Sequence, residues 1–201
     1  MSDRGRFVVL EGGEASGKST QARLLAHHWR AAGRRVDLTF EPGATPLGKD
    51  LRRLLLDTAD PVDPLAELLL LVADRAEHVA RVVRPALDAG VDVVCDRYVP
   101  SSLVYQGLVR GVGLEVVERV NAGFPRPDVV VVLDVSDAVA VARRGVPSDR
   151  IEREGEEFHA RVRAGYRTLA SERGWLVVDG DGAPDDVARR VAQVVEANLA
   201  R

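Results

Sequence analysis

Short apolar runs recur along the chain, and most of them end in a glycine or a carboxylate. Residues 7–10 are wholly apolar and are followed by glycines, which is typical of a strand buried on both faces of a parallel sheet. Four later runs have the same character. The pattern therefore predicts five strands, at residues 7–10, 36–40, 91–96, 129–133 and 175–178.

Helical spacing of apolar residues fills the segments between these strands. The first helix follows Ser19 and ends before Gly33. The other helices are expected at 46–56, in a long stretch after Pro64 that Gly90 closes, at 101–108, 114–123, 137–144 and 156–172, and from Pro184 onward. Strands that alternate with helices indicate a parallel sheet covered on both faces. We expect one α/β domain over residues 1–201, without a linker or repeat.

The long helix after Pro64 carries an apolar stripe at helical spacing, which we expect to face the core. Its members are Leu65, Leu68, Leu69, Val72, Ala76, Val79, Ala80 and Val83.

Charge and composition narrow the classes of function. The net charge is -3 and the isoelectric point about 5.9, so no global basic field indicates nucleic-acid binding. The sole cysteine, Cys95, lies in an apolar run and reads as a small core residue. No apolar run approaches the roughly 18 residues that a bilayer span needs, and the N-terminus reaches the first glycines too early for a signal peptide. We expect a cytoplasmic protein that binds neither membrane nor nucleic acid.

A glycine-rich loop follows the first strand. Gly12, Gly17, Lys18 and Ser19 match G-x-x-x-x-G-K-[ST], in which backbone N–H groups surround phosphates, the lysine reaches the terminal phosphates and the hydroxyl binds Mg²⁺. Lysine otherwise occurs only at Lys49, which makes Lys18 informative in an arginine-rich chain. The alternative is a glycine turn that carries a lysine by chance. The predicted ATP-binding loop comprises Gly12, Gly13, Glu14, Ala15, Ser16, Gly17, Lys18, Ser19 and Thr20.

A carboxylate should share the Mg²⁺ site with Ser19. Asp96 ends the third predicted strand and Asp134 ends the fourth, and ligands of open α/β sheets lie at such strand ends. Position along the chain favours Asp96, with Asp134 as the rival.

Three interpretations of a phosphate loop are a kinase, a GTP switch and a protein that only binds ATP. A switch needs N-K-x-D, and neither Asn121 nor Asn198 begins that motif. The kinase interpretation explains the loop at residues 143–155, which holds four arginines between 143 and 153. Arginines that close over a transferring phosphoryl group stabilise its charge and exclude water. The alternative is a solvated charged loop.

Four segments of the chain resemble bacterial thymidylate kinases. They are LEGGEASGKST, EPGATPLGKDLRRLLLD at 41–57, DRYVPSSLVYQGLVRG at 96–111 and DRIEREGEEFHARVRAGY at 149–166. The resemblance implies the P-loop nucleoside-monophosphate kinase fold, Mg²⁺- and ATP-dependent phosphorylation of dTMP to dTDP, and a homodimer.

The same resemblance assigns roles to residues. The acceptor set that it implies for dTMP is Glu14, Glu41, Arg52, Leu71, Arg75, Arg97, Ser102, Tyr105 and Gln106. Arg97 would grip the acceptor phosphate, Arg75 would donate to a thymine carbonyl, and Glu14 would accept from the sugar 3′-hydroxyl. Arg75 could instead form a salt bridge with Asp74 or Glu77, and Tyr105 could simply pack in the core.

Catalysis would fall to Lys18, Arg97, Glu14 and the lid arginine Arg150, with Arg144 as a further contact to ATP. Ala15 stands where animal and yeast relatives carry an arginine, so the lid would have to supply that charge. Two positions depart from the usual family pattern. Leu71 replaces a phenylalanine that stacks on thymine, and Phe40 replaces an arginine before Glu41.

Overall fold

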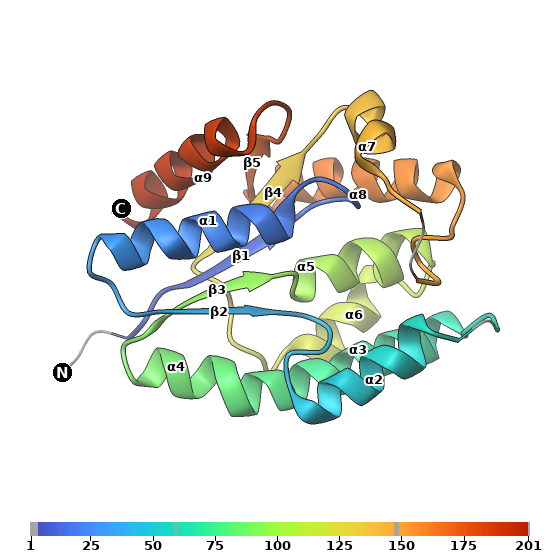
Figure 1. Cartoon of the computed structure of the whole chain (residues 1–201). Helices are drawn as coiled ribbons and strands as arrows, with labels where there is room; N and C mark the ends of the chain where they lie inside the picture. Colours follow the sequence, from blue (N-terminus) through green and yellow to red (C-terminus); the bar gives the residue numbers. More distant parts are fainter. Residues whose placement is uncertain (1–3, 59, 147–148, 201) are drawn as a thin grey trace.

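The computed structural model describes residues 4–58, 60–146 and 149–200. Its centre is a five-stranded parallel sheet, which confirms the predicted fold class (Figure 1). The strand order is β2-β3-β1-β4-β5. The strands are β1 (Phe7–Glu11), β2 (Val36–Phe40), β3 (Asp92–Asp96), β4 (Val129–Asp134) and β5 (Leu176–Asp179).

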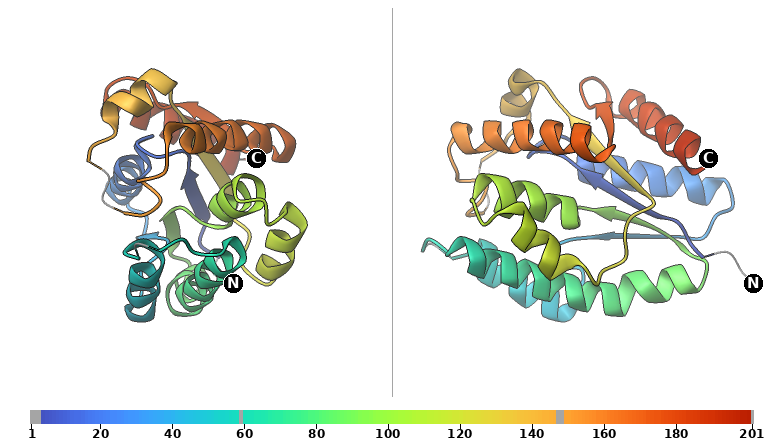
Figure 2. Two further views of the ribbon diagram at one scale, coloured as in Figure 1. Left: turned by 90° about the vertical axis from the view of Figure 1, so that its right-hand side faces the viewer. Right: turned by 180° about the vertical axis from the view of Figure 1, so that it is seen from behind.

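Helices cover both faces of this sheet (Figures 1 and 2). One face is covered by α1 (Lys18–Ala31) and α9 (Pro184–Leu199), which pack against each other. The other face carries α3 (Pro64–His78), α4 (Arg84–Asp88), α5 (Val99–Ser102), α6 (Leu114–Asn121) and α8 (Glu156–Arg173). Outside these layers lie α2 (Pro46–Leu56), which packs on α3, and α7 (Asp137–Arg143). Two π-helical segments, η1 (Val79–Val83) and η2 (Leu103–Val109), continue α3 and α5.

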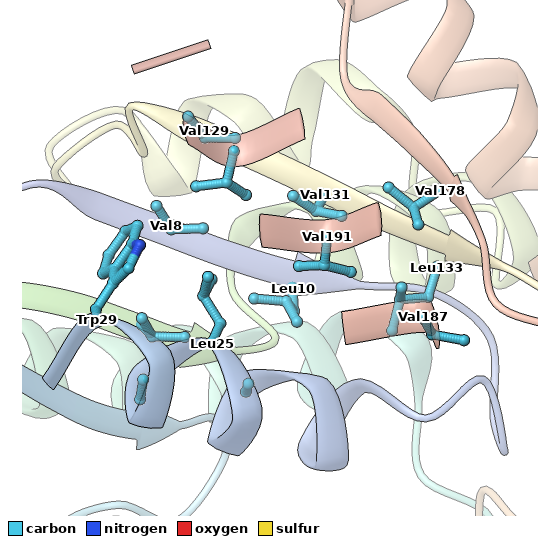
Figure 3. Packing of buried hydrophobic residues seen from close by; sticks show 14 of the residues in the cluster. Val8, Leu10, Leu25, Trp29, Val129, Val131, Leu133, Val178, Val187 and Val191 are labelled. Carbon is cyan, nitrogen blue, oxygen red and sulfur yellow. The ribbon is translucent and has the colours of Figure 1, made fainter. Parts of the chain in front are cut away.

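The hydrophobic core has two halves, one on each side of the sheet. Val8, Leu10, Val131 and Leu133 point from the strands toward α1 and α9, where Trp29 closes one end of the cluster (Figure 3). Alternate strand residues, such as Phe7 and Val9, point to the opposite face. Burial on both faces is the reason that the strands read as uninterrupted apolar runs. Cys95 is fully buried among them, as predicted.

The predicted apolar stripe of the long helix is only partly correct. Leu68, Val79 and Val83 are buried, whereas the side chains of Leu65 and Leu69 are 47% and 50% exposed. Ala76 and Ala80 are also exposed, and Val72 is half-buried. The buried face of α3 instead includes four charged or polar residues that hydrogen-bond within the fold: Glu67, Asp74, Arg75 and His78. Helical spacing alone does not distinguish that polar inner face from the apolar outer one.

The topology brings the chemistry to one edge of the sheet. The connection that leaves β1 runs toward β2, and the one that leaves β3 runs toward β4, so the strand order reverses between these neighbours. Leu10 pairs with Asp96 in register across this point. A reversal of this kind opens a crevice at the carboxyl ends of the two strands. The glycine loop after β1 and the Asp96–Arg97 turn after β3 therefore lie side by side.

Candidate active site

The glycine loop wraps around an amino group. Lys18 is buried, and its Nζ donates to the carbonyl oxygen of Gly13 at 2.6 Å. Gly12 has φ 139°, and a Cβ there would lie 2.5 Å from the carbonyl oxygen of Leu133, so only glycine fits. Gly17 has φ 93° and leads into α1, whose N-terminus faces the loop. This geometry is a phosphate cradle that has a helix dipole behind it.

Burial also changes the chemistry of this lysine. Removal from water, and then the nearby Arg97 guanidinium, lower the pKa of Lys18 to about 7. An anionic ligand in the loop would favour the charged amine again. The electrostatics of the loop therefore favour an anionic ligand such as a phosphate.

A hydroxyl–carboxylate pair stands at the mouth of the loop. Ser19 Oγ donates to Asp96 Oδ2 at 2.5 Å, and Asp96 Oδ1 has no hydrogen-bond partner among the described residues. Asp134, the rival carboxylate, accepts from Arg167 Nε at 2.9 and 3.0 Å. Of these two carboxylates, Asp96 is the one positioned to share a ligand with Ser19.

One cavity of about 710 Å³ joins this loop to the rest of the predicted site. Lys18, Ser19, Ala15 and Asp96 line one end. All nine residues of the expected acceptor set also line it: Glu14, Glu41, Arg52, Leu71, Arg75, Arg97, Ser102, Tyr105 and Gln106. They come from the glycine loop, the β2–α2 connection and the helices that follow it, and the segment after β3.

Arg75 is held in place by groups that are distant in sequence. It is 2% exposed, and its Nε donates to Glu41 Oε2 at 2.8 Å. Its Nη1 donates to Asn121 Oδ1 at 2.6 Å and its Nη2 to Ser102 Oγ at 3.1 Å. Each of the two terminal nitrogens keeps a second N–H for a ligand. Arg75 does form a salt bridge, but with Glu41 rather than with the helix neighbours considered from sequence.

Arg97 occupies a strained and crowded position. Its φ is 71°, a left-handed value that non-glycine residues seldom adopt and that is often found at functional sites. The contacts of its guanidinium are long, at 3.2 to 3.5 Å, and they go to Ser101 Oγ, Tyr105 Oη, Tyr166 Oη and the carbonyl oxygen of Gly12. An arginine with long contacts inside a cavity keeps most of its capacity to bind an anion.

Glu11, which the sequence did not single out, accepts hydrogen bonds from the segment that follows Arg97 and holds it in place. It is fully buried and accepts four hydrogen bonds, from Tyr98 N, Ser101 N, Ser101 Oγ and Tyr166 Oη, at 2.6 to 3.2 Å. Burial raises the pKa of this carboxyl, although its donors oppose the shift. The only sequence signal was a carboxylate at the end of a buried strand.

Glu14 lies near two other acidic groups that also line the cavity, Glu152 and Asp149. Burial, and then the Glu152 carboxyl, raise the pKa of Glu14 to about 7. Asp149 raises that pKa further, and Arg144 opposes the shift. The ring Nδ1 of His159, on α8, lies 3.5 Å from Glu14 Oε2. Glu14 is therefore a half-buried acid that is readily protonated near neutral pH.

The two lid arginines do not meet the glycine loop in this structure. Arg150 Nη2 donates to Glu67 Oε2 at 2.5 Å, and its Nε donates to the carbonyl oxygen of Leu55. Arg144 Nη1 donates to Glu156 Oε2 at 2.8 Å. Neither residue lines the cavity. The buried Glu67 carboxylate and the Leu55 carbonyl oxygen hold Arg150, a competition that the sequence does not display. Arg144 contacts the half-exposed Glu156, and its Nε and Nη2 have no hydrogen-bond partner among the described residues.

Comparison with known proteins agrees with this geometry. The family model described as Thymidylate kinase matches residues 10–191. A thymidylate kinase of Synechococcus sp. (strain JA-2-3B'a(2-13)) is 47% identical over 198 residues, which cover 96% of this chain and 95% of the relative. One from Deinococcus radiodurans is 43% identical over 196 residues, with 94% and 95% covered.

A solved structure shows the same architecture. The crystal structure of thymidylate kinase from Ehrlichia chaffeensis superposes with a TM-score of 0.80 at 29% identity, and the match covers 96% of this chain and 99% of that one. Three findings lead to the same conclusion: the phosphate-binding loop, the cavity that the expected acceptor residues line, and the relatives that match along nearly their whole length. The chain belongs to the thymidylate kinase family.

Proposed function

We propose that the chain transfers the γ-phosphoryl group of ATP to dTMP and gives dTDP. One observation carries the proposal: Lys18 and Ser19 of the glycine loop and all nine expected acceptor residues line a single cavity. A phosphoryl donor and an acceptor can therefore bind in the same cavity. Phosphoryl transfer needs positioning and charge stabilisation more than covalent chemistry, and this cavity offers both.

The donor and acceptor ends have distinct tasks. Lys18 and the loop amides would hold the terminal phosphates of ATP, and Arg97 would hold the phosphate of dTMP. Arg52, whose Nη1 donates to the carbonyl oxygen of Pro42 at 2.9 Å, would assist Arg97. Tyr105 would lie along the sugar, and Glu14 would accept from the 3′-hydroxyl.

Mg²⁺ fits the oxygen donors at the mouth of the loop. Ser19 and Asp96 supply a hydroxyl and a carboxylate, and Asp96 Oδ1 is unpaired among the described residues. No group of three His, Cys, Asp or Glu in the described part of the chain could hold a metal alone. This suits Mg²⁺, which usually binds through one or two protein oxygens together with phosphates and water. When bound, the ion would neutralise charge that develops on the transferring phosphoryl group.

We also propose a homodimer. Four exposed apolar residues recur at helical spacing on one face of α3 and η1: Leu65, Leu69, Ala76 and Ala80. Such stripes mark interaction surfaces when they are not scattered. No helix among the described residues is long and apolar enough to cross a membrane. We expect the enzyme to act in the cytoplasm, where its nucleotide substrates are found.

The test is ADP release across a panel of nucleoside monophosphates in the presence of ATP and Mg²⁺. We expect dTMP to give the highest kcat/KM. Higher activity with UMP, CMP or AMP would contradict the thymidylate assignment and leave a different kinase. ATP binding without turnover on any acceptor would favour the binding-only interpretation.

A further inference from the structure

The acceptor end of the cavity contains an amide whose orientation is fixed from behind. Gln106 is 1% exposed and lines the cavity. Its Nε2 donates to Glu67 Oε1 at 2.6 Å, and its Oε1 has no hydrogen-bond partner among the described residues. Buried polar atoms are rarely left unpaired unless a ligand or water completes them.

Glu67 determines which end of that amide faces the cavity. A carboxylate only accepts hydrogen bonds, so the side chain of Gln106 must turn its NH₂ group toward Glu67. Glu67 is itself 1% exposed and cannot turn to solvent. Arg150 Nη2 donates to its other oxygen at 2.5 Å, and Arg110 Nε lies 3.6 Å from Oε1. Two guanidinium groups therefore compensate the buried charge and keep the carboxylate in place.

The result is a hydrogen-bonding pattern at the base site. Arg75 offers N–H donors, and Gln106 offers an acceptor oxygen. Thymine presents the complementary edge, with a carbonyl at C4 and an N–H at N3. Cytosine presents the reverse, with an amino group at C4 and a bare nitrogen at N3, so both contacts would fail.

We propose that Glu67 is a positioning residue for base selection: it locks the Gln106 amide so that the cavity accepts pyrimidines with an N3–H and rejects cytosine. The inference rests on the proposed function and extends it to a residue that does not touch the substrate. Uracil has the same edge as thymine, so Glu67 does not distinguish these two bases.

The test is the selectivity of the Glu67→Gln variant, measured as kcat/KM for dTMP, dCMP and dUMP. An amide at position 67 can donate as well as accept, which allows the Gln106 amide to turn over. We expect the dTMP-to-dCMP ratio to fall about ten- to hundredfold, because buried groups discriminate strongly through unpaired hydrogen bonds. The dTMP-to-dUMP ratio should stay within about twofold, since both bases lose the same contact.

Two further variants separate this role from structural damage. In the double variant Glu67→Gln/Gln106→Glu, the carboxylate lies at position 106 and the amide at position 67 donates to it. An acceptor oxygen again faces the cavity, so this variant should restore the preference for dTMP over dCMP. Arg150→Ala removes one of the two guanidinium groups at Glu67 but leaves the carboxylate and Arg110, which lies 3.6 Å from its Oε1. Its dTMP-to-dCMP ratio should therefore match wild type whatever happens to kcat.

The outcomes distinguish the two proposals. A wild-type enzyme that does not phosphorylate dTMP contradicts the proposed function. If the wild type is active but Glu67→Gln keeps the wild-type dTMP-to-dCMP ratio, only the role of Glu67 is overturned. The same holds if the dTMP-to-dCMP and dTMP-to-dUMP ratios fall equally in this variant. If the single variant does not fold, a folded double variant that retains the ratio supports the inference, and one that has lost it overturns the inference.

Discussion

Removal of the Glu11 carboxylate should uncouple the Arg97 segment from the sheet. In Glu11→Ala, the buried backbone N–H of Tyr98 loses its acceptor, and that of Ser101 keeps only the carbonyl oxygen of Tyr98, at 3.1 Å. Each unsatisfied buried group costs about 1–3 kcal/mol, and the two hydroxyl donors lose a charged partner as well. We expect the free energy of unfolding to fall by about 3–5 kcal/mol.

Glu11→Gln provides the matched control. Its amide oxygen can still accept from both backbone N–H groups, and the hydroxyls of Ser101 and Tyr166 can rotate to accept from the new NH₂ group. This variant should lose less than half as much stability as Glu11→Ala. Urea denaturation of the two proteins gives the comparison.

The kinetic consequence follows from the contact between Arg97 and Ser101. If Glu11 positions this segment, Glu11→Ala raises the KM for dTMP more than the KM for ATP. Equal destabilisation by the two variants would refute the reasoning, because the backbone donors would then not depend on the acceptor at Glu11. A loss below about 1 kcal/mol in Glu11→Ala would refute it as well.

Three other predictions concern the metal, the pH dependence and the assembly. Asp96→Asn should lower kcat about 10²–10³-fold in an ADP-release assay, whereas Asp134→Asn should leave it unchanged; equal losses would contradict the assignment. The pKa of Glu14 is raised from 4.5 to about 7, so the native state binds the extra proton between these values. The free energy of unfolding should therefore fall as pH rises from 5 to 8, and by less in Glu14→Gln; equal slopes would contradict the shift. Leu69→Glu should convert a dimer to a monomer in light scattering, whereas Val177→Glu, at an exposed position of the edge strand β5, should not.

The sequence predicted the fold closely because its signals are local. β2 and α2 begin and end at the predicted residues, and the other strand boundaries differ by one residue at most. Strands buried on both faces are read from continuous apolar runs, and glycines mark their ends. The prediction failed at the stripe of α3, where half of the apolar positions are exposed. In α3, hydrogen bonds to residues outside the helix determine which face is buried.

The candidate site was predictable to the extent that it lies in contiguous motifs. The glycine loop, Asp96 and Arg97 follow from the order of strands. The partners of Arg75 do not, since Glu41 is 34 residues away and Asn121 is 46 residues away. Glu11 and Glu67 were missed for the same reason: each is an isolated acid in sequence, and its donors meet it only in the folded chain.

Arg150 is the residue at which the resemblance and the structure differ most, and electrostatics explains both. The Arg150 guanidinium has two possible anionic partners: the single charge of Glu67 and the several charges of bound phosphates. A lid that closes on ATP would draw Arg150 toward the phosphates, because the larger charge offers the stronger attraction. Glu67 would not be left unpaired, since Arg110 already lies 3.6 Å from its Oε1 and Gln106 donates to that same oxygen. The acceptor-facing amide would therefore keep its orientation with or without Arg150 beside Glu67, and base selection would not need to wait for ATP.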